Sequence, residues 1–391
     1  MVSGAAGTMG RVTTRTRGGT RRPSLLGPVN TLVRGVWDLP AAIGGRPAGE
    51  RLERMRRSAQ YHDGAFRNAV PPSGVSPAGN GREIGRELLR NRALRRPSGA
   101  VPVERRTAAD FVAPPLDGLR LTWLGHATTL VEVEGRRVLL DPLWSERCSP
   151  TTLLGPRRLH PVPMPLHELP RLDAVLISHD HYDHLDMATI RRLAALQPAV
   201  PIVVPLGVGA HLERWSVPLS RIVELDWEET VRVAGVDLTA AAARHFSGRL
   251  RQDNGTLWAS WVIAGRSRRV FYTGDSGFFD GYATIGATHG PFDATLVQIG
   301  AYSPYWPDIH MTPEQGLAAH LAVRGSLMIP VHWCTFNLAL HGWSEPVERL
   351  STEALSTEAL SSGARIAVPN PGQILDVAAA APTTPWWRAI A

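Results

Sequence analysis

The chain contains no lysine, so all 42 of its basic residues are arginine. It has only two cysteines, Cys148 and Cys334, which are too few for a disulfide framework. The missing lysine, together with abundant alanine, glycine and proline, is typical of a GC-rich genome, and we infer no function from it. With 391 residues, the chain is long enough for one large domain of about 250 residues and an extension.

The charge is unevenly distributed along the chain. Residues 1–110 contain 20 arginines and 8 acidic residues, a net charge of +12, whereas residues 111–391 contain 22 arginines and 27 acidic residues, a net charge of −5. Residues 1–22 have almost no apolar side chains, so we expect a disordered basic tail there. We expect an extension with short helices over residues 23–110 and a catalytic domain over residues 111–391. A cationic arm suits an anionic surface, either phospholipid head groups or nucleic acid.

The extension also contains an apolar stripe between Leu25 and Trp37. Its apolar residues recur at helical spacing beside arginines, so this segment can lie in a membrane interface. Packing on the catalytic domain, or a homodimer face, explains the stripe equally well. The stripe is too short to span a bilayer, which needs about 20 apolar residues. It also does not suit an export signal, because Arg34 would interrupt the apolar core of that signal. We therefore expect a cytoplasmic protein that contacts the inner membrane face peripherally.

The most informative motif is the run His-Asp-His-Tyr-Asp-His at residues 179–184. It directly follows residues 173–178, whose apolar character is typical of a buried strand. In an extended segment alternate side chains point the same way, so His179 and His181 can bind one ion while Asp183 and His184 turn toward a second. Imidazoles and carboxylates suit zinc, and two adjacent metals are typical of hydrolases.

Three further residues of metal-binding type follow strand-like segments later in the chain. His245, Asp275 and His332 come after the apolar segments at residues 237–243, 268–273 and 326–331. Side chains at strand ends lie on loops of a rigid scaffold, where sites are commonly built. Other strands are expected at residues 119–123, 129–133 and 137–140, and helices at residues 49–61, 82–95, 187–196, 207–215 and 313–323.

This pattern of histidines and aspartates resembles the signature of the metallo-β-lactamase superfamily. The resemblance implies an αββα sandwich, in which two sheets lie between outer helices. It also implies two zinc ions, although oxygen and nitrogen ligands accept other divalent metals. By this resemblance, one zinc is bound by His179, His181 and His245, the other by Asp183, His184 and His332, and Asp275 bridges the two.

A second set of motifs, within about residues 111–376, resembles N-acylphosphatidylethanolamine-hydrolysing phospholipase D. The resemblance implies hydrolysis of an N-acylated phosphatidylethanolamine or a related phospholipid to N-acylethanolamine and phosphatidic acid, by attack of a metal-activated water on phosphorus. The motifs are TWLGHAT at 122–128, DPLW at 141–144, GPRRLH at 155–160, RHFSGR at 244–249, GAY at 300–302, HMTPE at 310–314 and PVHWCTF at 330–336.

Two other functions compete with this one. A lactonase acting on sugar-phosphate lactones can use the same dinuclear site, and it differs in needing a closed polar pocket rather than apolar area beside the metals. The other is a non-catalytic protein whose basic arm binds nucleic acid. We rank it last, and expect no specific nucleic-acid partner, because structural zinc sites are usually rich in cysteine and the proposed ligands include none.

The resemblance also implies roles for residues next to the metals. Asp275 fixes the attacking water in addition to bridging the metals, and His310 contacts the substrate or donates a proton. His126 and Asp180 are expected to support the ligands rather than to react.

Four residues are expected to bind the substrate. Arg244 and Arg249 flank the proposed ligand His245, where a guanidinium can pair with a phosphate, and one of the two is expected to form a structural ion pair instead. Tyr302 and Trp306 can line an apolar channel for acyl chains.

Overall fold

The computed structural model describes residues 1, 39–75, 79–250, 253–355, 363, 365–379 and 384–391. Apart from Met1, the expected basic tail at residues 1–22 and the apolar stripe between Leu25 and Trp37 lie outside the described residues. The boundary expected between extension and catalytic domain, at residues 110 and 111, therefore stays a prediction.

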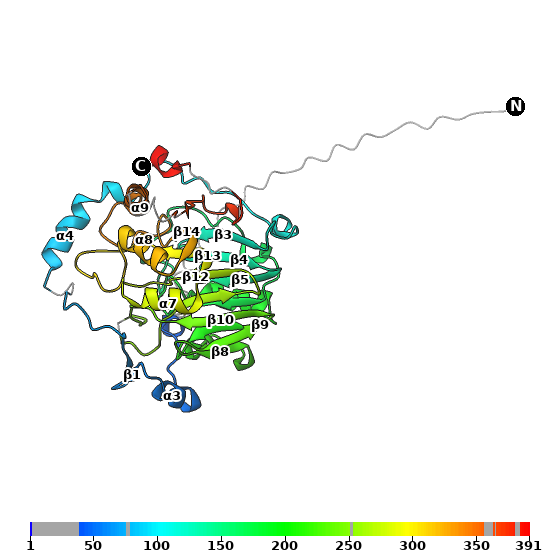
Figure 1. The fold of residues 1–391 in the computed structure, drawn as a ribbon, viewed down its shortest axis with the longest axis vertical. Helices are drawn as coiled ribbons and strands as arrows, with labels where there is room; N and C mark the ends of the chain where they lie inside the picture. The colour runs from blue at the N-terminus through cyan, green and yellow to red at the C-terminus, as the bar shows by residue number, and fades with distance from the viewer. Residues whose placement is uncertain (2–38, 76–78, 251–252, 356–362, 364, 380–383) are drawn as a thin grey trace.

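Two seven-stranded mixed sheets form the centre of the molecule (Figure 1). In one sheet, β3, β4 and β5 form the expected antiparallel meander, and β6 to β8 continue it in parallel. In the other, β9 to β12 are antiparallel, and β13 to β15 follow in parallel. The strand order of the first sheet is β16 (Ile374–Asp376), β3 (Leu119–Gly125), β4 (Thr128–Val133), β5 (Arg136–Leu140), β6 (Ala174–Leu176), β7 (Ile202–Pro205) and β8 (Ile222–Leu225). That of the second is β15 (Arg365–Ile366), β14 (Gly325–Val331), β13 (Phe292–Gln298), β12 (Arg269–Tyr272), β11 (Ser260–Ala264), β10 (Val236–Ala241) and β9 (Thr230–Val233).

The first sheet is buried on both faces, which explains why its strands are almost continuously apolar. Val131 of β4 points to the core between the sheets, where it joins Trp261 of β11. Its neighbour Leu130 points the other way and packs with Ile190 of α5 (Met187–Leu196). Burying such a side chain contributes about 1.5–3 kcal/mol to folding, so both faces fix the register of these strands.

Helices cover the outer faces of both sheets. The helices α5 and α6 (Gly209–Arg214) pack on the first sheet. The second sheet is covered by α7 (Gly281–His289), α8 (Pro313–Ala322) and α9 (Glu345–Glu353) (Figure 1). The architecture is therefore the expected αββα sandwich, and none of the helices among the described residues is long and apolar enough to cross a membrane.

The described part of the extension begins with α2 (Leu39–Ala42) and α3 (Gly49–Arg56), and α3 is shorter than the helix expected at residues 49–61. Tyr61 instead belongs to β1 (Tyr61–His62), which pairs with β2 (Ala65–Phe66). The two residues between these strands, Asp63 and Gly64, have positive φ angles of 52° and 78°. An Asp-Gly pair is a strong signal for a tight hairpin, so the turn ends the helical pattern earlier than the apolar spacing predicts.

The second helix of the extension, α4 (Gly81–Arg90), also ends before the expected residue 95 and is followed by a 3-10 turn at Ala93–Arg95. In Figure 1, α4 lies at the periphery near α9, whereas α3 and β1 lie at the opposite end of the molecule. The extension thus runs along one side of the sandwich, and its buried residues Met55 and Phe66 join a small core with Leu206 and Trp258.

Candidate metal centre

The His-Asp-His-Tyr-Asp-His motif forms the loop between β6 and α5. Asp186 caps the amino terminus of α5 by accepting a hydrogen bond from the backbone N–H of Ala188, which ends the loop two residues after His184. Within the loop, His184 and Leu185 both donate backbone hydrogen bonds to the carbonyl of His181. The turn places the motif side chains on one side of the loop, where His179 and His184 are buried.

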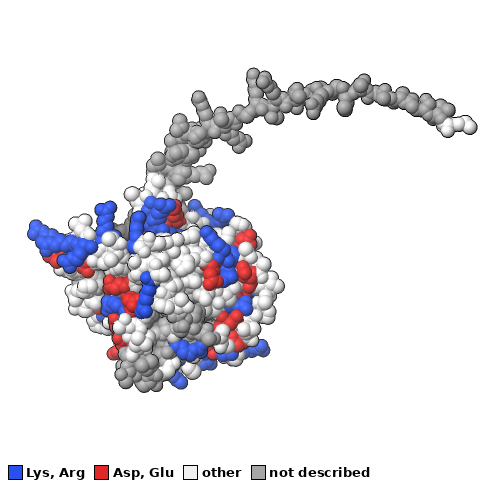
Figure 2. All heavy atoms as spheres, turned by 90° about the horizontal axis from the view of Figure 1, so that it is seen from above, with Lys and Arg blue, Asp and Glu red and all other residues white. Residues whose placement is uncertain are grey.

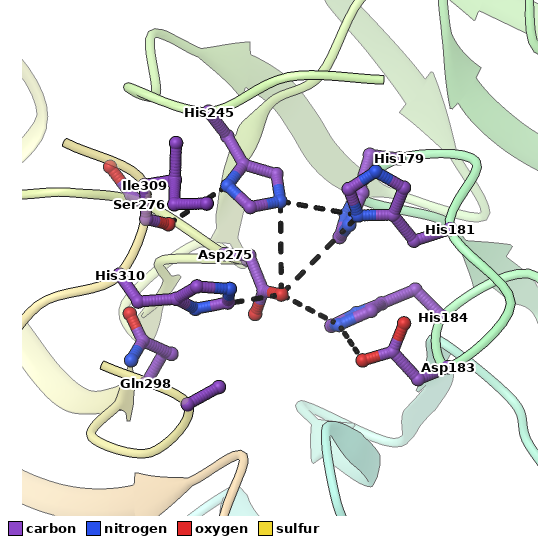
Figure 3. Close-up of polar contacts among 12 residues, drawn as sticks. His179, His181, Asp183, His184, His245, Asp275, Ser276, Gln298, Ile309 and His310 are labelled. Carbon is purple, nitrogen blue, oxygen red and sulfur yellow. Dashed lines mark hydrogen bonds and ion pairs between the residues drawn. The ribbon is translucent and has the colours of Figure 1, made fainter. Parts of the chain in front are cut away.

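A first group of ligand atoms comes from His179, His181 and His245. His179 Nε2 lies 2.8 Å from His181 Nδ1, and His245 Nε2 lies 3.3 Å from the same atom. His245 follows β10, so the fold of the two sheets brings it to the motif from 64 residues away in sequence. The three imidazoles therefore form a compact set of nitrogen donors (Figure 3).

A second group consists of Asp183, His184, His332 and His126, whose ligand atoms lie within 4.8 Å of one another. His332 directly follows β14 and places Nε2 3.2 Å from Asp183 Oδ2. His126 places Nε2 2.9 Å from the same oxygen. Both His126 and His332 have positive φ angles, 52° and 64°, which are unfavourable for residues other than glycine and are typical of functional sites.

Asp275, which follows β12, lies between the two groups (Figure 3). Its Oδ2 atom is 3.1 Å from the Nε2 atoms of both His184 and His332, and 3.9 Å from those of His179 and His245. One carboxylate oxygen thus faces nitrogen donors of both groups. This is the arrangement that a bridging ligand requires.

The charges of the site are strongly coupled. Burial lowers the pKa of His179 and of His245 well below the ordinary value, and neighbouring imidazoles lower it further. Burial acts in the same direction on His332, but Asp275 and Asp183 outweigh it and raise its pKa to about 9. Asp183, Asp141 and Asp275 likewise raise the pKa of His184 well above its ordinary value, against the effect of burial. The carboxylates of Asp275 and Asp183 therefore favour positive charge at the neighbouring imidazoles.

The donor set fits a divalent cation in that role. Neutral imidazoles and carboxylates are the ligands that such ions take, and metal binding displaces protons from them. Two atoms of the proposed ligands, His184 Nε2 and Asp275 Oδ1, are buried without a hydrogen-bond partner among the described residues. Buried polar atoms of this kind are costly unless something satisfies them. A metal would be held by the seven residues named from the sequence, and the positions of His126 and His310 also bring these two side chains within reach.

Asp141 is a residue of the site that the sequence analysis quoted in a motif but did not assign. Its carboxylate accepts hydrogen bonds from His184 Nδ1 at 2.7 Å, Ser178 Oγ at 2.6 Å and the Tyr272 hydroxyl at 2.5 Å. The bond to Nδ1 leaves His184 Nε2 directed at the centre. His245 is oriented in the same way, because its Nδ1 donates to the carbonyl of Ile309 at 2.8 Å. Such outer partners fix the orientation and tautomer of metal-binding imidazoles.

His310 lies at the edge of the centre, two residues before Thr312, which forms a capping box with Gln315 at the start of α8. Its Nδ1 atom is 4.0 Å from Asp275 Oδ2 and has no hydrogen-bond partner in the described part of the chain. Its side chain is 12% exposed, whereas that of His184 is fully buried. Burial lowers the pKa of His310 to about 3, so its imidazole is neutral at pH 7.

The comparisons with known proteins agree with this geometry. The sequence profile of the β-lactamase superfamily domain matches residues 136–333, which include all the proposed ligands. The chain belongs to the metallo-β-lactamase superfamily. The fold and the identification as a metal-dependent hydrolase, both expected from the sequence, are thereby confirmed.

Relatives within the superfamily differ in how much their names say. The uncharacterized protein Rv0906 of Mycobacterium tuberculosis is 46% identical over 361 residues, which cover 91% of this chain and 94% of that protein. N-acyl-phosphatidylethanolamine-hydrolyzing phospholipase D 1 of Caenorhabditis elegans is 37% identical over 262 residues, covering 64% of this chain and 73% of that protein. Among solved structures, an isothiocyanate hydrolase from Delia radicum gut bacteria shares the fold, with a TM-score of 0.50 and 20% identity over 66% of this chain and 98% of the other.

Two of the four residues expected to bind substrate lie beside the candidate metal centre. Arg244 and Trp306 line a pocket together with His245. Arg244 also forms an ion pair with Asp308 at 2.8 Å. One of the two arginines was expected to form such a structural ion pair, and Arg244 does so. The indole N–H of Trp306 donates to the carbonyl of Ala301, which leaves the ring to face the pocket.

The other two expected substrate residues are engaged by the protein itself. Arg249 is buried, donates to the carbonyls of Ala42, Asp180 and Leu185, and lies over the rings of Tyr182 and Trp215. The structure therefore corrects its expected role from phosphate binding to packing.

Tyr302 also has partners within the protein, and its expected place in an apolar channel stays a prediction. Its hydroxyl donates to Glu345 at 2.6 Å, and its ring stacks on His341.

Asp180 has the supporting position that was expected for it. Its carboxylate accepts hydrogen bonds from the backbone N–H of Gly248 at 2.8 Å and from His211 Nε2 at 3.3 Å. The other ring nitrogen of His211 accepts from the N–H of Gly45, so the proton lies on Nε2. Asp180 thus ties the loop of His179 and His181 to the segment after His245 and to the extension.

Proposed function

We propose that the protein is a zinc-dependent phosphodiesterase of phospholipase D type. Its substrate would be N-acylphosphatidylethanolamine or a related phospholipid, and its products N-acylethanolamine and phosphatidic acid. The observation that carries this proposal is the position of Asp275 between two groups of ligand atoms, in a chain that is 37% identical to an enzyme named for this reaction. When bound, two adjacent zinc ions supply an activated water and stabilise charge on phosphoryl oxygens.

The residues of the chain contribute orientation and hydrogen bonding. Asp141 and the carbonyl of Ile309 hold His184 and His245 with Nε2 directed inward. The Asp275 carboxylate places one negative charge between the two groups of ligand atoms. His310 Nδ1 has no partner within the described structure and faces the same space, so its neutral imidazole can form a hydrogen bond with a substrate oxygen.

Contact with an anionic membrane surface is the second part of the proposal, and α4 supports it. None of its residues is buried, and a Cβ atom placed on Gly81 or Gly85 would meet nothing within 4 Å. Its apolar residues include Leu89, which is 74% exposed. An amphipathic helix whose apolar face is uncovered is typical of membrane-interface segments.

The charges of α4 indicate which surface it contacts. Arg82, Arg86 and Arg90 lie exposed beside the apolar face and form no ion pair within the described residues. Figure 2 shows basic side chains projecting from the edge of the molecule at which α4 lies. Arginines favour anionic lipid head groups, while the neighbouring leucines favour the acyl boundary of a bilayer over nucleic acid.

The proposed activity is tested by assaying purified, metal-analysed protein for release of N-acylethanolamine from N-acylphosphatidylethanolamine in mixed micelles. His184→Ala is the control, because it removes a proposed ligand. Turnover by the wild type that is absent in the control supports the proposal. Hydrolysis of sugar-phosphate lactones without release of N-acylethanolamine would replace the phosphodiesterase with the lactonase.

A further inference from the structure

The backbone of His245 lies beyond the end of a strand. β10 ends at Ala241, so its ladder with β11 provides no partner for the backbone N–H and carbonyl of His245. His245 is only 1% exposed, which shields these two groups from water. Buried backbone groups without a partner are costly. The position of this proposed ligand therefore depends on what bonds to its backbone.

Asn68 of the extension supplies both bonds. Its Oδ1 atom accepts from the backbone N–H of His245 at 3.0 Å, and its Nδ2 atom donates to the His245 carbonyl at 2.8 Å. The orientation of the amide is fixed, because Oδ1 also accepts from the indole N–H of Trp258 at 3.2 Å, whereas Nδ2 faces a carbonyl. Within the described part of the chain, the two backbone groups of His245 form no other hydrogen bond. Asn68 thus fixes the backbone of His245 from outside the sandwich.

The extension also acts on the ring of His245, through a neighbouring segment. His245 Nδ1 donates to the carbonyl of Ile309, which directs Nε2 toward the centre (Figure 3). Asp308, the residue before Ile309, accepts at Oδ2 from both the backbone N–H and the hydroxyl of Ser73, each at 2.7 Å. The other carboxylate oxygen of Asp308 pairs with Arg244 at 2.8 Å. The extension therefore holds the backbone of one ligand and the segment that orients its ring.

The neighbours of His245 have partners within the sandwich instead. The backbone N–H of Arg244 donates to Ser276 Oγ at 2.9 Å, and its carbonyl accepts from the N–H of Gly277 at 2.8 Å. On the other side, the ring of Phe246 packs on that of His181, with centroids 4.4 Å apart. If these contacts alone positioned the ligand, Asn68 would only fasten the extension and contribute to stability. If Asn68 positions the ligand, its loss changes metal binding.

We infer that Asn68 is a positioning residue for metal binding, which holds His245 where Nε2 can join the other two imidazoles of the first group on one ion. This inference rests on the metal centre of the proposed function and not on the lipid substrate. The tolerance is small, because such ligands must be held within about 0.5 Å of their productive geometry. His245 Nε2 already lies 3.3 Å from His181 Nδ1. The second group does not depend on Asn68, since Asp141 orients His184 there.

Zinc binding to the whole chain, measured by competition with a chelator, tests the inference with Asn68→Ala. Loss of an outer partner of a metal ligand typically costs about 10–100-fold, so one zinc dissociation constant should rise by about tenfold or more, while the other stays as in wild type. Asn91→Ala is the matched control. Asn91 also lies in the extension and donates to a backbone carbonyl, that of Leu340 at 2.8 Å, but it contacts no proposed ligand. Both dissociation constants of the control should equal those of the wild type.

The same substitution in a His245→Ala background separates positioning from a general structural effect. Asn68 bonds to the backbone of residue 245 rather than to its ring, so its two bonds can still form in that background. If Asn68 acts through the imidazole, Asn68→Ala should not weaken zinc binding further once the imidazole is gone. The melting temperature should fall by the same amount in both backgrounds.

A second variant applies if Asn68→Ala does not fold. Ser73→Ala removes one of the two bonds to Asp308 and keeps the other, so folding should tolerate it. It should weaken zinc binding by a smaller factor than expected for Asn68→Ala, and only while His245 is present. Unchanged zinc affinity in Ser73→Ala would then overturn the inference.

The remaining outcomes are distinct. Zinc affinities of Asn68→Ala that equal those of the wild type would overturn the inference, and so would an equal loss of affinity with and without the His245 imidazole. A wild type that binds no zinc would overturn it together with the metal centre. Zinc binding that follows the expected pattern without release of N-acylethanolamine would refute the proposed reaction and retain the role of Asn68.

Discussion

Asp141 accepts a 2.7 Å hydrogen bond from His184 Nδ1 and is itself completely buried. The same carboxylate accepts from the Tyr272 hydroxyl and from both the hydroxyl and the backbone N–H of Ser178, so four donors surround one negative charge. This contact directs His184 Nε2 toward Asp183 and Asp275. The metal centre therefore depends on a carboxylate that does not face it.

Asp141→Asn should weaken metal binding. The amide has no negative charge to stabilise the His184 proton on Nδ1, and loss of such an outer partner typically costs 10–100-fold in metal affinity or activity. Metal affinity is measured by competition with a chelator. Tyr272→Phe is the matched control, since it removes one hydrogen bond to Asp141 but keeps the carboxylate, and it should have a smaller effect. Equal metal affinity in wild type and Asp141→Asn would remove this role from Asp141.

His310→Ala should keep the metals and lose rate. Its imidazole lies at the edge of the centre, 4.0 Å from Asp275, and is more exposed than the buried ligands. Loss of one hydrogen bond to an oxygen that gains charge in the transition state typically costs about 10²–10³-fold in kcat, so kcat should fall by about that factor. Metal content per chain is measured on the same preparation. If the variant loses metal instead, His310 is a ligand and its substrate role is wrong.

Replacing Arg82, Arg86 and Arg90 of α4 by serine should weaken binding to vesicles that contain anionic phospholipid. Each basic residue near such a surface contributes about 1 kcal/mol, so the triple variant should lose about 3 kcal/mol of binding free energy, less at high salt. Co-sedimentation with vesicles gives the partition coefficient. The control is a variant in which Arg171, Arg192 and Arg214 are replaced in the same way. It loses the same number of positive charges, but from exposed positions outside α4. Indistinguishable binding by the two variants would mean that α4 is not the contact.

His320 should make the fold sensitive to mild acid. It is buried on α8, its Nδ1 lies 2.7 Å from Thr295 Oγ1, and burial lowers its pKa from 6.5 to about 4. The unfolded chain therefore binds this proton first as the pH falls. The contribution of neutral, buried His320 to the free energy of unfolding is complete above pH 6.5. It is lost as the pH falls toward about 4, and the total loss is about 3 kcal/mol.

The change is measured from urea unfolding at pH 7 and pH 5. Wild type should lose about 2 kcal/mol more of its free energy of unfolding than His320→Gln over this interval, because glutamine cannot be protonated. Other buried histidines titrate in both proteins, so their effect cancels in the comparison. An equal loss in the two proteins would show that His320 is not the group concerned.

Most of the fold and of the ligand set could be predicted because their signals are local. His179 to His184 are contiguous, and His245, Asp275 and His332 each follow an apolar strand. The start of α8 was predictable for the same reason, since Thr312 and Gln315 form a capping box around Pro313.

The residues that orient the site could not be predicted, because their partners are distant in sequence. Asp141 is 43 residues from His184, and Asn68 is 177 residues from His245. In the sequence, the position of Arg249 near His245 suggested a phosphate ligand. Only the fold shows that its guanidinium already donates hydrogen bonds to three backbone carbonyls. The Asp63-Gly64 turn was an available local signal that the helical spacing around it concealed.

Metal content of the wild type and of Asp275→Asn, with turnover of N-acylphosphatidylethanolamine on the same preparations, tests the metal centre most directly. Asparagine keeps the shape of Asp275 but loses the charge that faces both groups of ligands, so binding at both should weaken. We predict two zinc ions per wild-type chain, fewer than two in a variant that is still folded by circular dichroism, and no measurable turnover by that variant. Two bound metals and full turnover in Asp275→Asn would contradict a centre bridged by Asp275.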